Sequence, residues 1–183
     1  MTCVRRRQFL RSLLGTVVVA PVVASAGLVR ADAAALPSFL PEMPPGIVPA
    51  VAGKTIVYSM GQMRIWALAP GYRLVKTHLV SGRYGNPPPG RYHVFSKSTS
   101  SFAVRKPEIS WLYMVRFAKT PLGNNIGFHQ IPLRCLPGKK CEPVQSEAEL
   151  GQPRSSGCVR QKPSDARWMY NWADIGTMVI VTK

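Results

Sequence analysis

A cysteine and a distant histidine give this sequence its clearest chemical signal. Cys158 directly follows Gly157, and His129 lies upstream within a segment that is typical of a strand. Glycine has no Cβ, so it leaves the thiol approachable and lets the backbone form a tight or positive-φ turn. A histidine that is distant in sequence but close in the fold can accept the thiol proton. We therefore predict that Cys158 is a nucleophile and that His129 is its base.

Basic residues and backbone donors surround the cysteine. Arg154 and Arg160 flank it, and Lys162 follows shortly after. Positive charge favours a thiolate, so we expect these three side chains to support ionisation of the thiol. We expect the backbone N–H groups of Gly157 and Cys158 to stabilise the oxyanion of a tetrahedral intermediate. No acidic triad member is evident near the motif, which favours a main-chain carbonyl as the group that orients the histidine.

Five ordered segments carry a resemblance to a known family. They are Ser81-Gly82 followed by 86–92 (NPPPGRY), 126–129 (IGFH), 155–160 (SSGCVR), 165–172 (DARWMYNW) and 176–181 (GTMVIV). In this order they resemble the catalytic half of the L,D-transpeptidase (YkuD) family of cell-wall cross-linking enzymes, over roughly residues 54–183. The resemblance implies a mainly β fold, a β-sandwich of short strands with one short helix after the nucleophile turn.

The resemblance also implies an activity. It predicts an exported peptidoglycan L,D-transpeptidase, an acyltransferase of cell-wall biogenesis and cell shape that uses no cofactor and no metal. Its donor is a tetrapeptide stem, cut between an L-configured centre of diaminopimelate and the terminal D-alanine. Cys158 forms a thioester with the donor, and the amine of a neighbouring stem accepts the acyl group. The predicted partners are therefore the donor and acceptor stem peptides.

The same resemblance suggests roles for further residues. The backbone carbonyl of Gln130 is expected to orient the base. Arg160 is placed to meet a substrate carboxylate, or alternatively forms a structural pair. Ser156 stands where the family usually has a histidine, two residues before the cysteine. We assign Ser156 and Tyr113 to substrate binding, with Arg116 as the alternative to Tyr113 at the cleft.

Three other functions remain open from the sequence. The first is an L,D-carboxypeptidase of the same fold, in which water accepts the acyl group. The second is a non-catalytic, basic cell-wall-binding domain, suggested by Ser156 and by the excess of basic residues. The third is a zinc site made of His129, Cys135, Cys141 and Cys158. Against it, the spacing of Cys135 and Cys141 is looser than in most structural zinc sites.

Cys135 and Cys141 are expected to form a disulfide. A Pro-Gly turn at 137–138 lies between them and lets the two residues approach each other. An oxidising compartment favours such a bond. Cys158 is then left over, and an odd thiol in an exported protein suggests a reactive one.

The first 53 residues are expected to lie outside the catalytic domain, which we place at 54–183. Residues 1–33 have a charged start, an apolar run and small-residue sites, which is typical of an export signal. The start resembles a twin-arginine signal, so we predict a periplasmic or cell-wall protein whose membrane contact is transient, through the signal only. A retained anchor is the alternative. Residues 34–53 are rich in proline and predict a semi-rigid spacer.

The chain is strongly basic. Its formal net charge is +16 at pH 7. Removing residues 1–33 takes away five arginines and one aspartate, which leaves 19 basic and 7 acidic residues and a charge of +12. Such a field concentrates polyanions near the surface. Because no nucleic-acid-binding motif is recognised, we predict anionic cell-envelope polymers as partners and no nucleic acid.

Alternating and β-branched segments predict the strands that position these residues. The expected strands cover 55–59, 63–68, 73–80, 91–95, 109–117, 125–131 and 177–182. Pro163 and a Ser164 N-cap are expected to open the short helix. A polar loop is expected at 97–101. The alternation predicts that His78 is a surface residue, and the size of Trp111 predicts a core position.

Overall fold

The computed structural model describes residues 52–183. The predicted export signal at 1–33 and all but the last two residues of the predicted spacer lie outside the described residues. Within the described part, no helix combines the length and the apolar character that crossing a membrane requires.

Short strands dominate residues 52–183. In chain order the elements are β1 (Thr55–Ser59), β2 (Arg64–Ala69), η1 (Pro70–Tyr72), β3 (Arg73–Leu79), β4 (Gly90–His93), β5 (Ser96–Ala103), β6 (Lys106–Lys119), β7 (Asn125–Gln130), β8 (Leu133–Arg134), β9 (Glu142–Pro143), η2 (Glu147–Glu149), β10 (Val159–Gln161), α1 (Pro163–Trp172) and β11 (Met178–Thr182).

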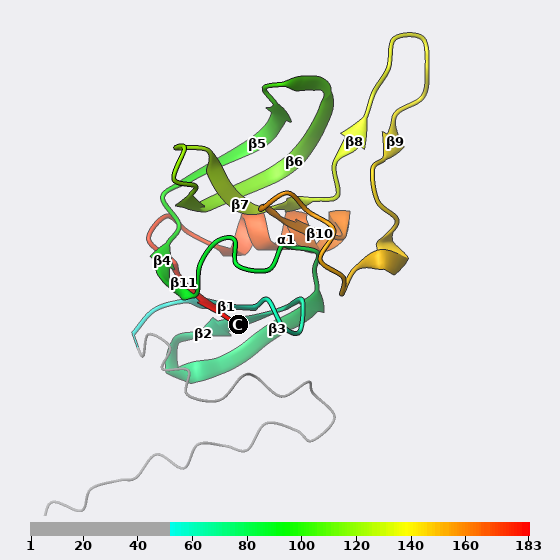
Figure 1. The fold of residues 1–183 in the computed structure, drawn as a ribbon. Helices are drawn as coiled ribbons and strands as arrows, with labels where there is room; N and C mark the ends of the chain where they lie inside the picture. The colour runs from blue at the N-terminus through cyan, green and yellow to red at the C-terminus, as the bar shows by residue number, and fades with distance from the viewer. Residues whose placement is uncertain (1–51) are drawn as a thin grey trace, which may run out of the picture. The chain divides into compact units, whose positions relative to one another are not determined.

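The strands form two mixed sheets (Figure 1). The first sheet has the order β3-β2-β1-β11-β4, and β1 and β11 run parallel in it. The second has the order β10-β7-β6-β8-β9, with β5 paired to β6, and β10 and β7 run parallel in it. The other pairs are antiparallel. The predicted β-sandwich with one short helix after the nucleophile turn is confirmed.

The main core lies between the two sheets. Side chains alternate across β1, so Ile56 and Tyr58 enter this core, where they join Val115 of β6 and Phe128 of β7. Val57 points the other way and belongs to a smaller apolar cluster. Full burial of a side chain such as that of Phe128 contributes roughly 2–3 kcal/mol to stability.

Helix α1 packs against β6 and β7 and follows directly after β10. Its N-cap is Lys162, which makes no side-chain cap, so the predicted Ser164 cap is wrong. Pro163 occupies the first helical position, where its missing N–H costs nothing. At the other end, Lys54 Nζ donates to the Trp172 carbonyl oxygen at 2.8 Å. This positive charge balances the negative end of the helix dipole.

The polar loop predicted at 97–101 is instead strand β5. Its serine-rich composition lacks the alternation that marks a half-buried strand. β5 nevertheless pairs antiparallel with β6 from Ser96 to Ala103, and no second strand within residues 52–183 borders it. Because an outer strand of a sheet can expose much of its side-chain surface, apolar patterning is not needed there.

His78 is buried and not at the surface, in contrast to the prediction. It is 8% exposed, and its Nε2 lies 2.7 Å from Oε1 of Gln161 on β10. Its partner on β2 is Ile65, a residue of the main core, so both side chains face inward. Burial lowers the pKa of His78. The neutral ring therefore donates to the Gln161 amide oxygen.

Candidate active site

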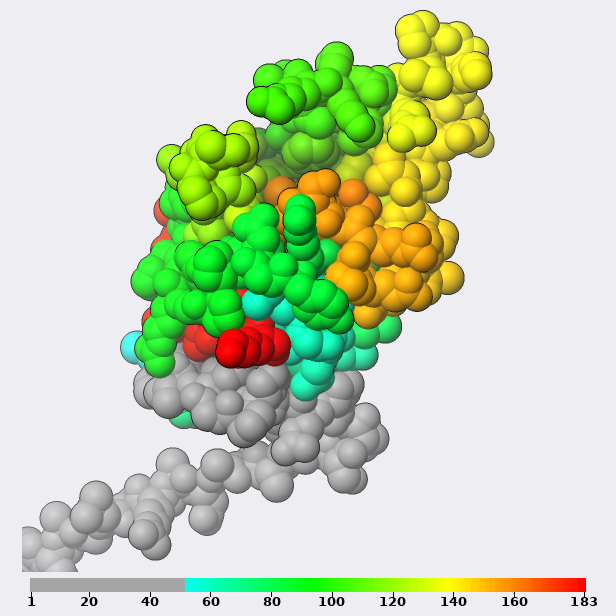
Figure 2. All heavy atoms as spheres, viewed as in Figure 1, coloured from blue at the N-terminus to red at the C-terminus, as the bar shows by residue number. Residues whose placement is uncertain are grey.

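Two neighbouring strands bring the predicted nucleophile and base together. β7 and β10 run parallel, with Val159 opposite Phe128 and Arg160 opposite His129. Val159 and Phe128 are buried in the main core. Because side chains alternate across a strand, Cys158, Arg160 and His129 face the other side. There they line one cleft of about 900 Å³. Figure 2 shows the segment that contains Cys158 (orange) at the surface, beside the yellow β8–β9 hairpin.

The imidazole of His129 is held in one tautomer. His129 is 3% exposed, and its Nδ1 lies 2.6 Å from the carbonyl oxygen of Gln130. A carbonyl can only accept a hydrogen bond, so Nδ1 carries the proton and Nε2 has a free lone pair. Burial, and in addition the charge of Arg160, lower the pKa of His129 to about 4, although the Gln130 hydrogen bond opposes this. The ring is therefore neutral at neutral pH and can accept a proton at Nε2.

Cys158 keeps a free thiol. Its Sγ donates a weak hydrogen bond to the Asn125 carbonyl oxygen at 3.6 Å, and the Gly127 N–H donates to the sulfur. Burial raises the pKa of the Cys158 thiol. The Gly127 N–H and the charges of Arg160 and Arg116 oppose this rise in pKa only in part. The resting residue is therefore a thiol.

The cations that act on the thiol are not all those predicted. Arg154 and Lys162 each pair with an acid of η2, Glu149 at 3.0 Å and Glu147 at 3.2 Å. Their charges are therefore largely engaged, and the predicted support of the thiolate by these two residues is wrong. Arg116 contributes in their place, because its partner in the β6–β7 ladder is the residue whose N–H contacts the sulfur.

A chain of hydrogen bonds that begins in the cleft lining holds Arg160. Its Nη1 donates to Oε1 of Gln145 at 3.1 Å, and Nε2 of Gln145 donates to Oγ of Ser81 at 2.6 Å. The backbones of Arg160 and Ser81 also exchange two hydrogen bonds, of 2.9 and 2.8 Å. Because Gln145 is buried, loss of the Arg160 partner would leave its Oε1 unsatisfied, whereas its Nε2 also donates to the Glu149 carbonyl oxygen at 3.2 Å. No sequence signal pointed to Gln145, which lies in the irregular segment between β9 and η2.

The turn before the nucleophile requires glycine. Gly157 has a φ of +149°, and a Cβ there would lie 2.6 Å from Nδ2 of Asn86. The Gly157 N–H donates to Oγ of Ser155 at 3.1 Å. In this state it is not available to an oxyanion, in contrast to the prediction, because its proton is already engaged. The Cys158 N–H remains the predicted donor. Ser156 is exposed and lines the cleft, as a substrate-binding role requires.

Two aromatic residues of β6 do not lie where the sequence predicted them. Tyr113 does not line the cleft within the described residues; its ring contacts Tyr170 of α1 at a centroid distance of 5.9 Å. Trp111, which was predicted to be a core residue, lines the cleft, and its ring stacks on the ring of His129 at a centroid distance of 4.7 Å. Its buried Nε1 has no hydrogen-bond partner among residues 52–183. The cause lies at Tyr113, whose φ of +61° interrupts the regular alternation of the strand.

The predicted disulfide between Cys135 and Cys141 is formed. It closes the hairpin between β8 and β9, which projects from the domain in Figure 1. Two of the four ligands of the zinc alternative are therefore bonded to each other. No group of three or more His, Cys, Asp or Glu side chains suited to a metal ion gathers within the described part of the chain.

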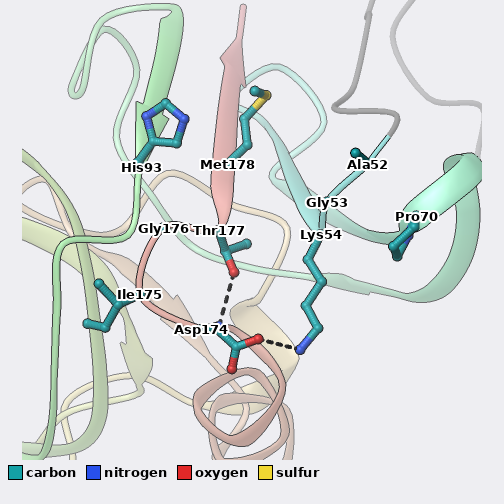
Figure 3. Close-up of a pocket in the computed structure, with 10 residues that line it drawn as sticks. All are labelled: Ala52, Gly53, Lys54, Pro70, His93, Asp174, Ile175, Gly176, Thr177 and Met178. Carbon is teal, nitrogen blue, oxygen red and sulfur yellow. Dashed lines mark hydrogen bonds and ion pairs between the residues drawn. The ribbon is translucent and has the colours of Figure 1, made fainter.

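A second hollow lies beside β4 and β11, with a volume of about 410 Å³ (Figure 3). His93 and Thr177 line it, together with Lys54 and Asp174, which pair at 2.6 Å. None of the described residues that line it is a cysteine, and the predicted site residues all lie elsewhere. This second hollow therefore offers no thiol among its described residues.

A comparison with family models matches residues 53–181 to the L,D-transpeptidase catalytic domain, YkuD. The match includes both strands that form the cleft and the turn that bears Cys158. A comparison with curated proteins gives no match.

Several solved structures resemble this chain. L,D-transpeptidase 3 from Mycobacterium tuberculosis, in complex with a faropenem-derived adduct, is 26% identical, with a TM-score of 0.52 over 72% of this chain and 60% of that one. An L,D-transpeptidase from Stackebrandtia nassauensis is 24% identical, with a TM-score of 0.53 over 74% of this chain and 58% of that one. An L,D-transpeptidase from Mycobacterium smegmatis is 18% identical, with a TM-score of 0.54 over 72% of this chain and 59% of that one. The latter two show the fold alone. The present chain spans about three fifths of the length of these proteins.

Proposed function

The chain belongs to the L,D-transpeptidase catalytic domain (YkuD) family, and on that premise we propose that it is an exported, cysteine-dependent enzyme that cross-links peptidoglycan stem peptides. The observation that carries the proposal is the pairing of β7 with β10. It sets a free thiol and a neutral imidazole of fixed tautomer in one cleft. A thiol beside such a base is the arrangement that covalent acyl transfer needs.

Acylation begins when the donor carbonyl lies against Cys158. The thiol turns away from the Asn125 carbonyl and gives its proton to Nε2 of His129. As the proton leaves, Sγ bonds to the carbonyl carbon, and the carbonyl oxygen becomes an oxyanion. The Cys158 N–H is the proposed donor to that oxyanion. A hydrogen bond between thiol and base that is absent at rest often forms only with substrate bound.

Collapse of this intermediate releases the terminal D-alanine. The carbon–nitrogen bond breaks, and His129 returns the proton to the departing amine, which leaves Cys158 joined to the stem as a thioester. The amine of a neighbouring stem then attacks the thioester and gives a proton to His129. The thiolate leaves, regains that proton, and the cross-linked product departs. No metal or cofactor takes part in these steps as proposed.

We place the reaction outside the cytoplasm, which the Cys135–Cys141 disulfide supports because such bonds persist in oxidising compartments. The basic charge supports the same location, since the envelope is rich in anionic polymers. Fractionation of cells that express the tagged full chain tests this. Recovery in the cytoplasm with both cysteines reduced would contradict it.

The activity is tested by incubating the purified chain with a tetrapeptide stem and analysing the products by mass spectrometry. We expect a cross-linked dimer and free D-alanine. Cys158→Ala should lower conversion by about four orders of magnitude or more, because the nucleophile is lost. Faropenem should add its mass to the wild type but not to Cys158→Ala, which separates loss of the nucleophile from loss of stem binding.

Two outcomes would redirect the proposal. A tripeptide without dimer identifies an L,D-carboxypeptidase, in which water takes the place of the acceptor amine. Binding of the stem by a folded protein that neither converts it nor reacts with faropenem identifies a non-catalytic cell-wall-binding domain. That second result would contradict the enzymatic proposal.

A further inference from the structure

The ionised side chains that line the cleft are nearly all positive. They are five cations and one carboxylate: Arg105, Lys106, Arg134, Arg154, Arg160 and Glu149. The single carboxylate is already satisfied, because Glu149 accepts from Arg154 at 3.0 Å and from the Ser146 N–H at 2.9 Å. Among the described residues of the lining, no other acid balances the remaining positive charge.

Three of these cations form one wall of the cleft, which we call the basic wall. Arg105 lies in the turn between β5 and β6, Lys106 is the first residue of β6, and Arg134 lies on β8. On β8, Leu133 pairs with Ser110 of β6, and the next residue, Arg134, pairs with Ile109. Ile109 also lines the cleft. None of the three belongs to an ion pair within residues 52–183, and all are exposed. Their charges are therefore available to a ligand.

The basic wall is distinct from the reacting groups. His129 lies on β7 and Cys158 directly before β10, whereas the basic wall comes from the β5–β6 turn, the first residue of β6 and β8. All of them line the same cleft, so a ligand long enough to extend along it can meet the thiol and the basic wall together. A low-dielectric cleft with charge of one sign concentrates ligands of the opposite sign. The complement of this cleft is an extended peptide that carries several carboxylates.

Resting on the function proposed above, we propose that the basic wall selects donor stems whose carboxylates are free over stems in which they are amidated. The diaminopimelate side chain and the residue before it each bear a carboxylate that an amide can replace. An amide keeps nearly the same shape but loses the charge. The basic wall lines the cleft that holds the thiol, which favours the stem itself as the ligand over an anionic wall polymer.

The test compares two tetrapeptide stems that differ only in amidation of these two carboxylates. For the wild-type chain we expect kcat/KM to be about tenfold higher for the free stem at low salt, because each exposed ion pair contributes only modestly. The preference should fall to about twofold at 0.5 M salt, where screening is strong. The difference should lie in KM, since the basic wall is remote from the bond that reacts.

A double variant, Lys106→Gln with Arg134→Gln, removes two charges of the basic wall. We expect its preference for the free stem to fall to about twofold, with kcat nearly unchanged. The matched control is Arg73→Gln with Arg167→Gln, two exposed cations on β3 and α1 that do not line the cleft. It has the same net charge as the double variant and should keep the wild-type preference.

Binding of both stems to Cys158→Ala, measured by titration calorimetry, shows selection without turnover. Conversion of both stems at equal kcat/KM overturns the selection and leaves the proposed enzyme intact. Preferential binding without conversion in the wild type supports the selection and overturns the enzyme. If the control variant loses the preference as fully as the basic-wall variant, the effect belongs to the overall charge and the proposal fails. A polyphosphate chain serves as an anionic competitor of the stem. If it inhibits stem conversion equally in the control variant and in the basic-wall variant, the basic wall does not bind anionic ligands and the proposal fails.

Discussion

The two hollows of this domain contain similar residue types but differ in how these residues are connected. Each has a histidine and a cation paired with a carboxylate: His129 with Arg154 and Glu149 nearby in the cleft, and His93 with the Lys54–Asp174 pair in the second hollow (Figure 3). His129 is buried, and the carbonyl of the next residue holds its Nδ1, whereas His93 is exposed at the end of β4.

The second hollow uses its charges for structure. Lys54 donates to the Trp172 carbonyl at the end of α1 and pairs with Asp174 just beyond it. In the cleft, by contrast, Arg160 is held by Gln145, and both side chains line the open space. The comparison teaches that an inventory of ionisable residues does not locate a site. What distinguishes the cleft is an imidazole of fixed tautomer and a free thiol that line the same space, with exposed cations that form no ion pair within residues 52–183.

The largest expected difference between the hollows is in the loss of a histidine. His129→Ala should lower kcat/KM for stem conversion by about 10²- to 10⁴-fold, because the thiol loses its proton acceptor. His93→Ala should change it by less than about twofold, since removal of an exposed side chain outside the cleft disturbs no reacting group. Steady-state kinetics of both purified variants measure this. Similar losses in the two would show that the cleft has no special role.

A smaller effect concerns the acid limb of the pH profile. Because the pKa of His129 is about 4, we expect kcat/KM to be flat near neutrality and to fall by half near pH 4, as the imidazole becomes protonated. The positive charge of Arg160 disfavours the imidazolium, so Arg160→Gln should raise the pKa of His129 and move the limb to higher pH. Circular dichroism at each pH checks that the fold persists.

The control for this shift is Arg73→Gln, which removes a charge far from the imidazole and should leave the limb in place. The position of the limb, and not the absolute rate, is the relevant readout, because Arg160 also faces substrate. An unchanged limb in Arg160→Gln, or one displaced to lower pH, would mean that another base accepts the proton.

The smallest effect is expected in the second hollow. Lys54→Met removes the hydrogen bond to the Trp172 carbonyl and the charge at the end of α1, and should lower the free energy of unfolding by about 1 kcal/mol. The thermal midpoint should fall by about 3 °C. Activity should stay at the wild-type level at 25 °C. Thermal unfolding followed by circular dichroism, together with kinetics, measures both quantities.

Asp174→Asn sharpens this result. The Asp174 carboxylate is exposed, so loss of its ion pair should change the free energy of unfolding by less than about 0.5 kcal/mol. If Lys54→Met lowered activity without lowering stability, the second hollow would have a functional role, and the contrast between the two hollows would not hold.

Much of the fold could be predicted because it follows local patterns. Residues 55–59, which begin with four successive β-branched or aromatic side chains, form β1 within the bounds expected. The predictions for residues 97–101 and for His78 were wrong, because what stabilises these residues comes from elsewhere in the chain. β5 relies on hydrogen bonds to β6, and the burial of His78 depends on its pairing with Ile65. Such pairings are set by chain topology and leave little trace in composition.

The sequence by itself determined the disulfide cysteines and the family, and it predicted Cys158 and His129 as nucleophile and base, because these depend on residue chemistry and on motifs a few residues long. It could not determine which cations act on the thiol, because Arg154 and Lys162 are engaged by η2 only in the folded chain. Nor could it reveal that Trp111 stacks on His129, since one left-handed residue at Tyr113 changes which side chains of β6 reach the cleft. These relations arise where segments distant in sequence come into contact, and tertiary structure alone decides them.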